Sequence, residues 1–167
     1  MSDKESTVCL ISVGNSMRGD DGIAAIVCSR IAEDHDLKVV HYQLDSFTGQ
    51  IVKCLQGYEC AIIVDAFESG KKTGEISEID LNEALASKRP LEIKSCHGFS
   101  LCDELRLSFW VNKLPKKLFL MGIEVDSCDW GEGISIPLQA KLDSITSKLK
   151  LLVCRLETEK APNAFAS

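Results

Sequence analysis

The chain has 167 residues, of which 45% are hydrophobic and 26% charged, and its formal net charge is -6 at pH 7. This length allows one buried core without metals or disulfides. The acidic balance, with no long basic run, argues against a nucleic-acid partner, and the chain has no apolar run long enough to cross a bilayer, so we expect no membrane partner either.

The cysteines and the amino-terminal residues bear on where the protein resides. Eight cysteines are scattered along the chain without a C-x-x-C pair. Residues 1–7 are polar, unlike the basic and then apolar start of a signal peptide. We therefore expect reduced, mostly buried thiols and a cytoplasmic location.

The first half of the sequence predicts strands that alternate with helices. Val8 to Val13 is an apolar run closed by a glycine, and residues 22–32 carry apolar side chains at helical spacing. A second strand is expected over residues 37–44, followed by another helix. Residues 61–64 predict a third strand, buried on both faces and ending at Asp65.

The second half continues the pattern with less regular spacing. Residues 73–79 alternate in polarity and predict a further strand, antiparallel or at an edge of the sheet. Residues 101–110 can form a helix, and residues 118–125 return to strand character. A helix beginning near Pro137 carries a leucine-rich stripe at helical spacing, so it should cover the sheet.

Strands alternating with helices predict an α/β fold, a three-layer sandwich with a mostly parallel twisted sheet between helices. We expect a single domain over residues 1–159 and a flexible tail over residues 160–167. In such folds ligands bind beyond the carboxyl ends of the strands. The chemistry is therefore expected in the loops at that edge.

Three segments place unusual polar groups where strands end or helices begin. They are GNSMRGDDG over residues 14–22, VDA over residues 64–66 and SCHG over residues 95–98. Asp21, Asp65 and His97 together offer two carboxylates and one imidazole, which can bind a borderline transition metal and leave positions open for water or substrate. Such a metal could polarise a carbonyl or activate water for peptide hydrolysis.

Structural interpretations compete with this one for each residue taken singly. Asp20 or Asp21 could cap the following helix, Asp65 could form a turn, and His97 could be an ordinary surface histidine. A phosphate-binding loop is disfavoured, because the paired carboxylates would repel a phosphate at the start of the helix.

The combination of motifs resembles the hydrogenase maturation protease family over about residues 8 to 150. The resemblance is carried by Val13-Gly14-Asn15 with Asp20-Asp21-Gly22, Val64-Asp65-Ala66 with Thr73-Gly74, and Ser95-Cys96-His97, with weaker support from Gly122-Ile123-Glu124 and Trp130-Gly131. The order and spacing of these short strings are more specific than any one of them.

The resemblance implies an endopeptidase that removes the carboxyl-terminal extension of a nickel-iron hydrogenase large-subunit precursor after nickel insertion. It implies that Asp21, Asp65 and His97 are both the catalytic and the metal-binding residues. Nickel would be supplied by the precursor, and no organic cofactor is expected. Asp21 stands where some family members have Glu, which keeps the carboxylate but shortens its reach.

The resemblance also points to residues that would meet the substrate, namely Asn15, Asp20, Asp45 and Thr48. The segment over residues 45–49 matches the family's Asp-Gly-Gly-Thr-like loop at its aspartate and threonine but has a phenylalanine between them. This loop is associated in the family with the choice of hydrogenase, so the particular substrate is not predicted.

Other functions remain open from the sequence. The same three residues could form a non-catalytic metal-binding or regulatory module. Zinc could bind Cys96, His97 and Cys102, although their spacing is not that of a paired-ligand zinc motif. A hydrolase using Ser100 or Cys96 with His97 as base lacks the usual nucleophile motif, and a nucleotide-binding protein is suggested by fold class alone.

Overall fold

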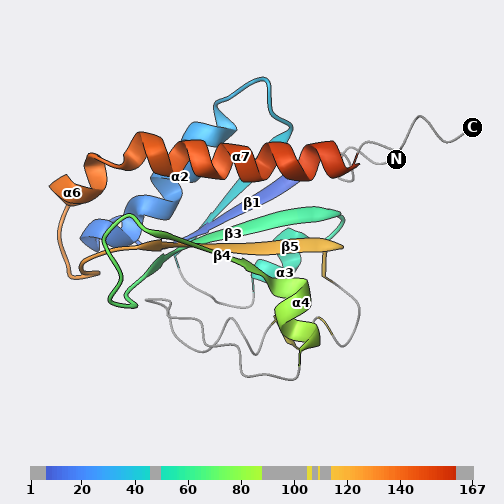
Figure 1. Ribbon diagram of the computed structural model, residues 1–167, viewed down its shortest axis with the longest axis horizontal. Helices are drawn as coiled ribbons and strands as arrows, with labels where there is room; N and C mark the ends of the chain where they lie inside the picture. Colours follow the sequence, from blue (N-terminus) through green and yellow to red (C-terminus); the bar gives the residue numbers. More distant parts are fainter. Residues whose placement is uncertain (1–6, 46–49, 88–104, 107–108, 110–113, 161–167) are drawn as a thin grey trace, which may run out of the picture.

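The computed structural model describes residues 7–45, 50–87, 105–106, 109 and 114–160. Within these residues a five-stranded sheet with the order β2-β1-β3-β5-β4 forms the centre of the fold (Figure 1). Four strands are parallel, and β4 runs antiparallel to β5 at one edge, which confirms the predicted edge strand. The strands are β1 Val8–Val13, β2 Val39–Leu44, β3 Cys60–Phe67, β4 Ile76–Asp80 and β5 Lys117–Glu124.

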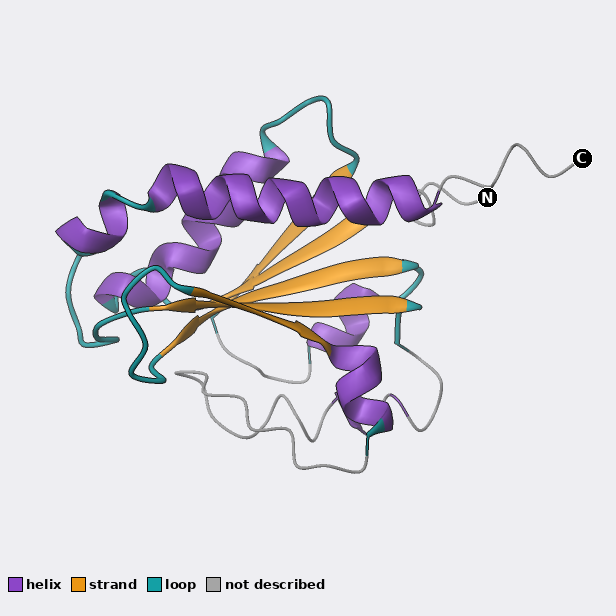
Figure 2. Cartoon of the chain, in the orientation of Figure 1, coloured by secondary structure: helices purple, strands orange, loops and turns teal. Residues whose placement is uncertain are grey.

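Helices cover both faces of the sheet, as the colouring by secondary structure shows (Figure 2). Helices α2 and α7 pack against each other over one face, and α3 and α4 lie against the other. The predicted α/β sandwich is therefore confirmed. The helices are η1 Gly19–Gly22, α2 Ile23–Ala32, α3 Ile51–Leu55, α4 Leu81–Ala86, α6 Ile136–Gln139 and α7 Leu142–Lys160.

The central strands are apolar throughout because both of their faces are covered. In β1, Val8 and Leu10 belong to the core under α2 and α7, while Cys9, Ile11 and Val13 belong to the core over α3 and α4. Neighbouring side chains of a strand point to opposite faces, so a strand between two cores needs a continuous apolar run. Each fully buried large aliphatic side chain contributes roughly 1.5–3 kcal/mol.

Strand β3 is longer than the sequence predicts. It continues past Asp65 to Phe67, and Asp65 pairs with Gly122 of β5. A Cβ atom on Gly122 would lie 2.3 Å from Cε2 of Phe67, so the glycine leaves the room that the phenyl ring occupies. The prediction that the strand ends at Asp65 is wrong, and Asp65 is held in the sheet rather than in a loop.

The carboxyl-terminal helix is divided where a single helix is predicted. The Lys141 N–H donates to Leu138 O, three residues back, and the Lys141 ammonium group donates to Thr73 O. This tighter turn separates α6 from α7. The predicted stripe is nevertheless confirmed, because its residues other than the half-buried Leu142 are buried: Leu138, Ile145, Leu149, Leu152 and Leu156.

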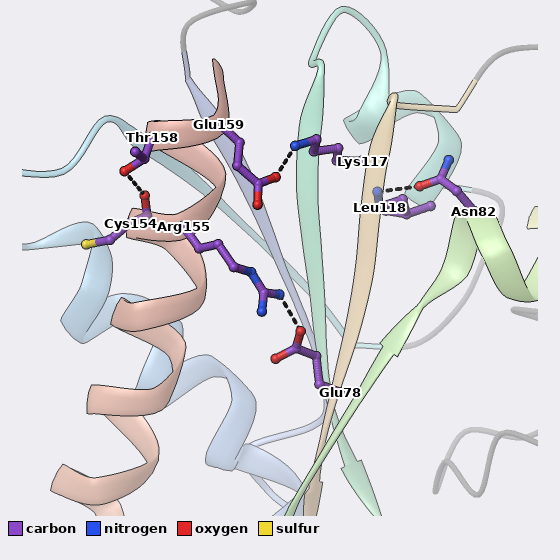
Figure 3. A network of polar contacts seen from close by, with 8 residues as sticks. All are labelled: Glu78, Asn82, Lys117, Leu118, Cys154, Arg155, Thr158 and Glu159. Carbon is purple, nitrogen blue, oxygen red and sulfur yellow. Dashed lines mark hydrogen bonds and ion pairs between the residues drawn. The ribbon is translucent and has the colours of Figure 1, made fainter. Parts of the chain in front are cut away.

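Ion pairs join the far end of α7 to the sheet (Figure 3). Arg155 pairs with Glu78 of β4, and Glu159 pairs with Lys117 of β5. The side chains are partly exposed, so each pair contributes at most about 1 kcal/mol. The Arg155 guanidinium also lies 5.2 Å from the ring centroid of Phe119, which adds a cation–π contact.

Several sequence predictions concern thiols, membranes and undescribed segments. Four of the six cysteines in the described part of the chain are buried, as expected for those residues. Among the helices that the structure describes, none is long and apolar enough to span a membrane. The predicted helix over residues 101–110 lies mostly outside the described residues, as does the tail beyond Lys160. The single-domain assignment stays a prediction.

Candidate active site

The segment after β1 turns back sharply at the carboxyl edge of the sheet. Gly14 has a φ of 147°, and a Cβ atom there would lie 2.1 Å from Asp21 O. A side chain at this position is excluded both by the backbone conformation and by the space available. Gly14 therefore allows the end of β1 and the acidic turn to pack backbone against backbone.

Asp21 is fully buried beneath this turn. The Asn15 N–H donates to its Oδ2 at 2.8 Å, and the Cys128 thiol lies 3.8 Å from its Oδ1. The N-cap residue of α2 is Gly22, and no side-chain capping bond is made there. The helix-capping interpretation is therefore wrong for Asp21, whose carboxylate points back to the loop rather than to the helix.

Asp20 is also buried, but its partner comes from far along the chain. The Ser135 N–H donates to Asp20 Oδ1 at 2.5 Å, and the Ser135 hydroxyl donates to Oδ2 at 2.9 Å. This bidentate contact spans 115 residues of sequence. The carboxylate of Asp20 therefore joins the acidic turn to the start of α6, and its contact with a substrate stays a prediction.

Backbone pairing reinforces the same connection. The Gly19 N–H donates to Gly131 O at 2.8 Å, and the Gly131 N–H donates to Met17 O at 3.1 Å. The Arg18 Nε–H donates to Cys128 O at 3.0 Å. Residues 17–19 and 128–131 are thus hydrogen-bonded to each other, and we call these two segments the frame of the acidic turn.

Asp65 lies on the neighbouring strand and is fully buried. The alternation of β3 puts it on the face that carries Ile63 and Phe67, toward α3 and α4. The η1 turn that contains Asp21 contacts β3. The structure therefore brings the two predicted carboxylates to the same edge of the sheet, one from a loop and one from a strand.

The remaining predicted residues are only partly described. Asn15 is half-buried, and its Oδ1 accepts a hydrogen bond from the Met17 N–H at 2.9 Å, which stabilises the turn. Asp45 is exposed just after β2, while Thr48 and His97 lie outside the described residues, as do the residues of the zinc and hydrolase alternatives. Among the described residues, no group of three or more His, Cys, Asp or Glu side chains could hold a metal ion. A metal site needs a donor beyond Asp21 and Asp65.

A fourth buried acid, Glu124, is not among the site residues that the sequence predicts. Glu124 ends β5 and is 2% exposed. Its Oε1 accepts from the Ser69 and Lys71 N–H groups at 2.7 and 3.0 Å, and its Oε2 accepts from the Ser69 hydroxyl at 2.7 Å. These bonds satisfy the carboxylate, as burial requires, and fix the loop after β3.

A polar cleft of about 610 Å³ opens next to this loop. Glu68 forms part of its wall and accepts a hydrogen bond from the Cys128 N–H at 2.7 Å. The cleft therefore borders the residue whose thiol contacts Asp21. Its other lining residues are Gly70, Lys71, Val125, Asp126, Ser127 and Asp129.

Comparison with known proteins identifies the architecture. The family profile HycI, hydrogenase maturation protease, matches residues 44–150. The hydrogenase maturating endopeptidase HybD from E. coli matches with a TM-score of 0.68 and 18% identity, over 89% of this chain and 93% of that chain. No curated protein sequence matches the chain.

Two archaeal structures match similarly. The [NiFe] hydrogenase maturation protease HybD from Thermococcus kodakarensis has a TM-score of 0.66 and 24% identity, over 88% of this chain and 99% of that chain. The [NiFe] hydrogenase maturation protease HycI from Thermococcus kodakarensis KOD1 has a TM-score of 0.61 and 21% identity, over 89% and 93%. At these identities the structures establish the fold alone. The evidence for a family comes from the profile match over residues 44–150.

Proposed function

Because this chain belongs to the hydrogenase maturation protease family and is an endopeptidase that processes a hydrogenase large subunit, we propose that it cleaves the precursor after nickel insertion. In this proposal Asp21, Asp65 and His97 meet the nickel carried by the precursor. The observation that supports it is the burial of two carboxylates, Asp21 and Asp65, at the carboxyl edge of the sheet. Ligands bind at that edge in folds of this type.

Burying a carboxylate costs free energy, so buried carboxylates often indicate a functional site. An ionised carboxylate taken out of water loses several kcal/mol unless hydrogen bonds, ion pairs or a metal replace its hydration. Asp21 accepts a hydrogen bond from a backbone N–H and lies against a thiol. A cation brought by the substrate would add a positive charge beside this carboxylate, and nickel accepts oxygen and imidazole ligands.

The chemistry follows from holding the metal next to the bond to be cut. A metal can polarise the carbonyl of a nearby peptide bond or lower the pKa of a bound water. Water then adds to the carbonyl carbon, the C–N bond breaks, and the departing amine takes up a proton. In this reaction the chain's own residues would hold the precursor's nickel in one position relative to the bond that is cut.

A cytoplasmic site of action belongs to the same proposal. It is supported by the scatter of the eight cysteines along the chain without a C-x-x-C pair, a pattern typical of proteins that keep their thiols reduced in the cytoplasm. The partner is the large-subunit precursor.

Cleavage of nickel-loaded and nickel-free precursors tests the proposal. The wild type is expected to release the carboxyl-terminal extension only from the loaded precursor, whereas Asp21→Asn and Asp65→Asn lose this activity by at least about 100-fold. In Asp21→Asn the amide oxygen can still accept from the Asn15 N–H, so the fold is expected to persist.

The matched control is Glu124→Gln, which alters another buried carboxyl group at the same edge. It is expected to lower thermal stability while keeping nickel-dependent cleavage. Equal loss of activity in all three variants would show that the loss comes from a folding defect and not from the site. Nickel-dependent binding without cleavage by the wild type would instead show a non-catalytic metal-binding module.

A further inference from the structure

Three large apolar side chains are exposed on the segments that frame the acidic turn. Met17 is 55% exposed, Trp130 is 77% exposed and Ile136 is 81% exposed. Single exposed hydrophobic residues are common on protein surfaces, but apolar groups gathered next to a site often mark a contact with a partner. These three come from two segments joined to each other by hydrogen bonds.

The exposed indole of Trp130 lies next to the Arg18 side chain. The Arg18 guanidinium carbon lies 5.8 Å from its ring centroid, and the Arg18 Nε–H is fixed on Cys128 O. The next residue, Gly131, is bonded to the backbone on both sides of Arg18. An aromatic group ordered in advance loses little conformational freedom on binding, and Trp and Arg are the residues that most often dominate interface energies.

The same frame is connected directly to the carboxylates of the site. Cys128, two residues before Trp130, contacts Asp21, and Ser135, one residue before Ile136, binds Asp20 through both oxygens. A molecule seated on Trp130 and Ile136 would therefore rest on the residues that position the acidic turn.

Charges around the exposed apolar groups indicate the chemistry of the partner. Asp126, Asp129 and Glu132 are exposed in the segment that carries Trp130. A partner segment with basic side chains beside apolar ones would be complementary to this surface. A second copy of the chain would be a poor partner, because a two-fold contact would set these same three carboxylates against each other.

We propose that Met17, Trp130 and Ile136 form a docking surface for the hydrogenase large-subunit precursor, with Trp130 as its anchor. This surface, called the tryptophan surface below, takes a precursor segment in which apolar side chains are flanked by basic ones. The inference rests on the proposed function, since it takes the precursor as the molecule that enters the site.

Binding is measured without turnover by using Asp65→Asn protein and nickel-loaded precursor. Adding Trp130→Ala is expected to raise the dissociation constant by at least about 10-fold, as for an interface anchor. Trp130→Phe, which keeps an aromatic ring, should raise it less. Leu151→Ala is the matched control, because Leu151 is 70% exposed on α7, away from the frame, and its removal should leave affinity unchanged.

In the otherwise wild-type enzyme, Trp130→Ala is expected to raise KM while kcat at saturating precursor stays the same. A purely structural role would instead lower kcat or thermal stability. Glu132→Lys should slow association, and the wild-type association rate should fall as salt increases. An affinity within twofold of wild type for Trp130→Ala and for Met17→Ala would overturn the proposal.

Two further outcomes separate this proposal from the proposed function. If the wild type cleaves no precursor but Trp130→Ala still weakens binding, docking is supported and the proteolytic role fails. If cleavage depends on Asp21 but not on Trp130, docking alone is overturned. Sedimentation showing a wild-type dimer that Trp130→Ala dissociates, with precursor binding unchanged, would assign the surface to a second copy and overturn the proposal.

Discussion

Carboxylate side chains occur in two regions of this molecule with opposite surroundings. In the turn over residues 14–22, Asp20 and Asp21 are buried and accept hydrogen bonds from serine, from a thiol and from backbone groups. At the far end of α7, Glu159 pairs with Lys117 of β5, and Glu78 of β4 pairs with Arg155 of α7, with all four side chains partly exposed (Figure 3). The first arrangement holds carboxylates inside the protein on hydrogen bonds, whereas the second neutralises them by ion pairs at the surface.

This difference in surroundings indicates which acidic residues are associated with function. Ion pairs at a surface are screened and add little stability, so their residues can change at small cost. Buried acids that accept hydrogen bonds inside the protein are held against their own desolvation, and groups in such an environment cluster at functional sites. The variants below test this contrast, beginning with the largest expected effect.

Gly14→Ala should disrupt the acidic turn most strongly. The added methyl group would meet Asp21 O at 2.1 Å and would impose an alanine at a φ of 147°. We expect a loss of at least about 3 kcal/mol in the free energy of unfolding, measured with urea, together with loss of precursor cleavage. Gly70→Ala is the control, because it also has a positive φ but no atom within 4 Å, and it should cost about 1 to 2 kcal/mol. Equal costs would show that the close approach in the turn is not required.

Ser135→Ala should loosen the connection between the turn and α6. It removes the hydroxyl donor to Asp20 Oδ2 while leaving the backbone donor to Oδ1. A hydrogen bond to a charged group contributes about 1.5–3 kcal/mol, so urea unfolding should show a loss in that range. Ser127→Ala, which removes an exposed hydroxyl bond to Asp129, should cost less than about 0.5 kcal/mol. If both variants cost the same, the frame does not depend on Ser135.

The two regions also differ in how far the sequence predicts them. Strand β1 and the stripe on α7 are confirmed because a buried strand needs a continuous apolar run and a covering helix needs apolar residues at helical spacing. The sequence also predicts charged residues on the outer side of α7, but it does not predict which residues of the sheet pair with them.

The frame around the acidic turn could not be predicted in the same way. The contacts of Ser135 with Asp20 and of Cys128 with Asp21 span 115 and 107 residues, and no local pattern marks either pair. The end of β3 was misplaced because Asp65 resembles a turn residue, whereas its pairing with Gly122 in β5 extends the strand. The sequence therefore predicted that Asp21 and Asp65 lie at one edge of the sheet, but it did not predict the residues that contact Asp21.

The pair of Arg155 with Glu78 should show the small energies of the exposed region. A double-mutant cycle with Arg155→Met and Glu78→Gln is expected to give a coupling of at most about 1 kcal/mol, because both side chains remain partly in water. Arg155→Met alone should cost more than the coupling, since it also removes the contact with Phe119. Cleavage should be unaffected in all three variants, and a loss of cleavage would link α7 to the site.

The smallest effect is expected from Asp34, which pairs with Lys150 of α7. The hydrogen bond from Lys150, assisted by the Asp36 backbone N–H, lowers the pKa of Asp34 below its usual 3.8. A carboxyl group whose pKa is lower in the folded state stabilises the fold above its unfolded pKa, and this contribution is lost as the pH falls through the lowered value. Asp34→Asn should therefore flatten the acid limb of the stability curve slightly, and added salt should erase the difference because the pair is exposed. An acid limb identical in Asp34→Asn and wild type at low salt would show that even this pair contributes nothing, which would sharpen the contrast with the buried acids of the turn.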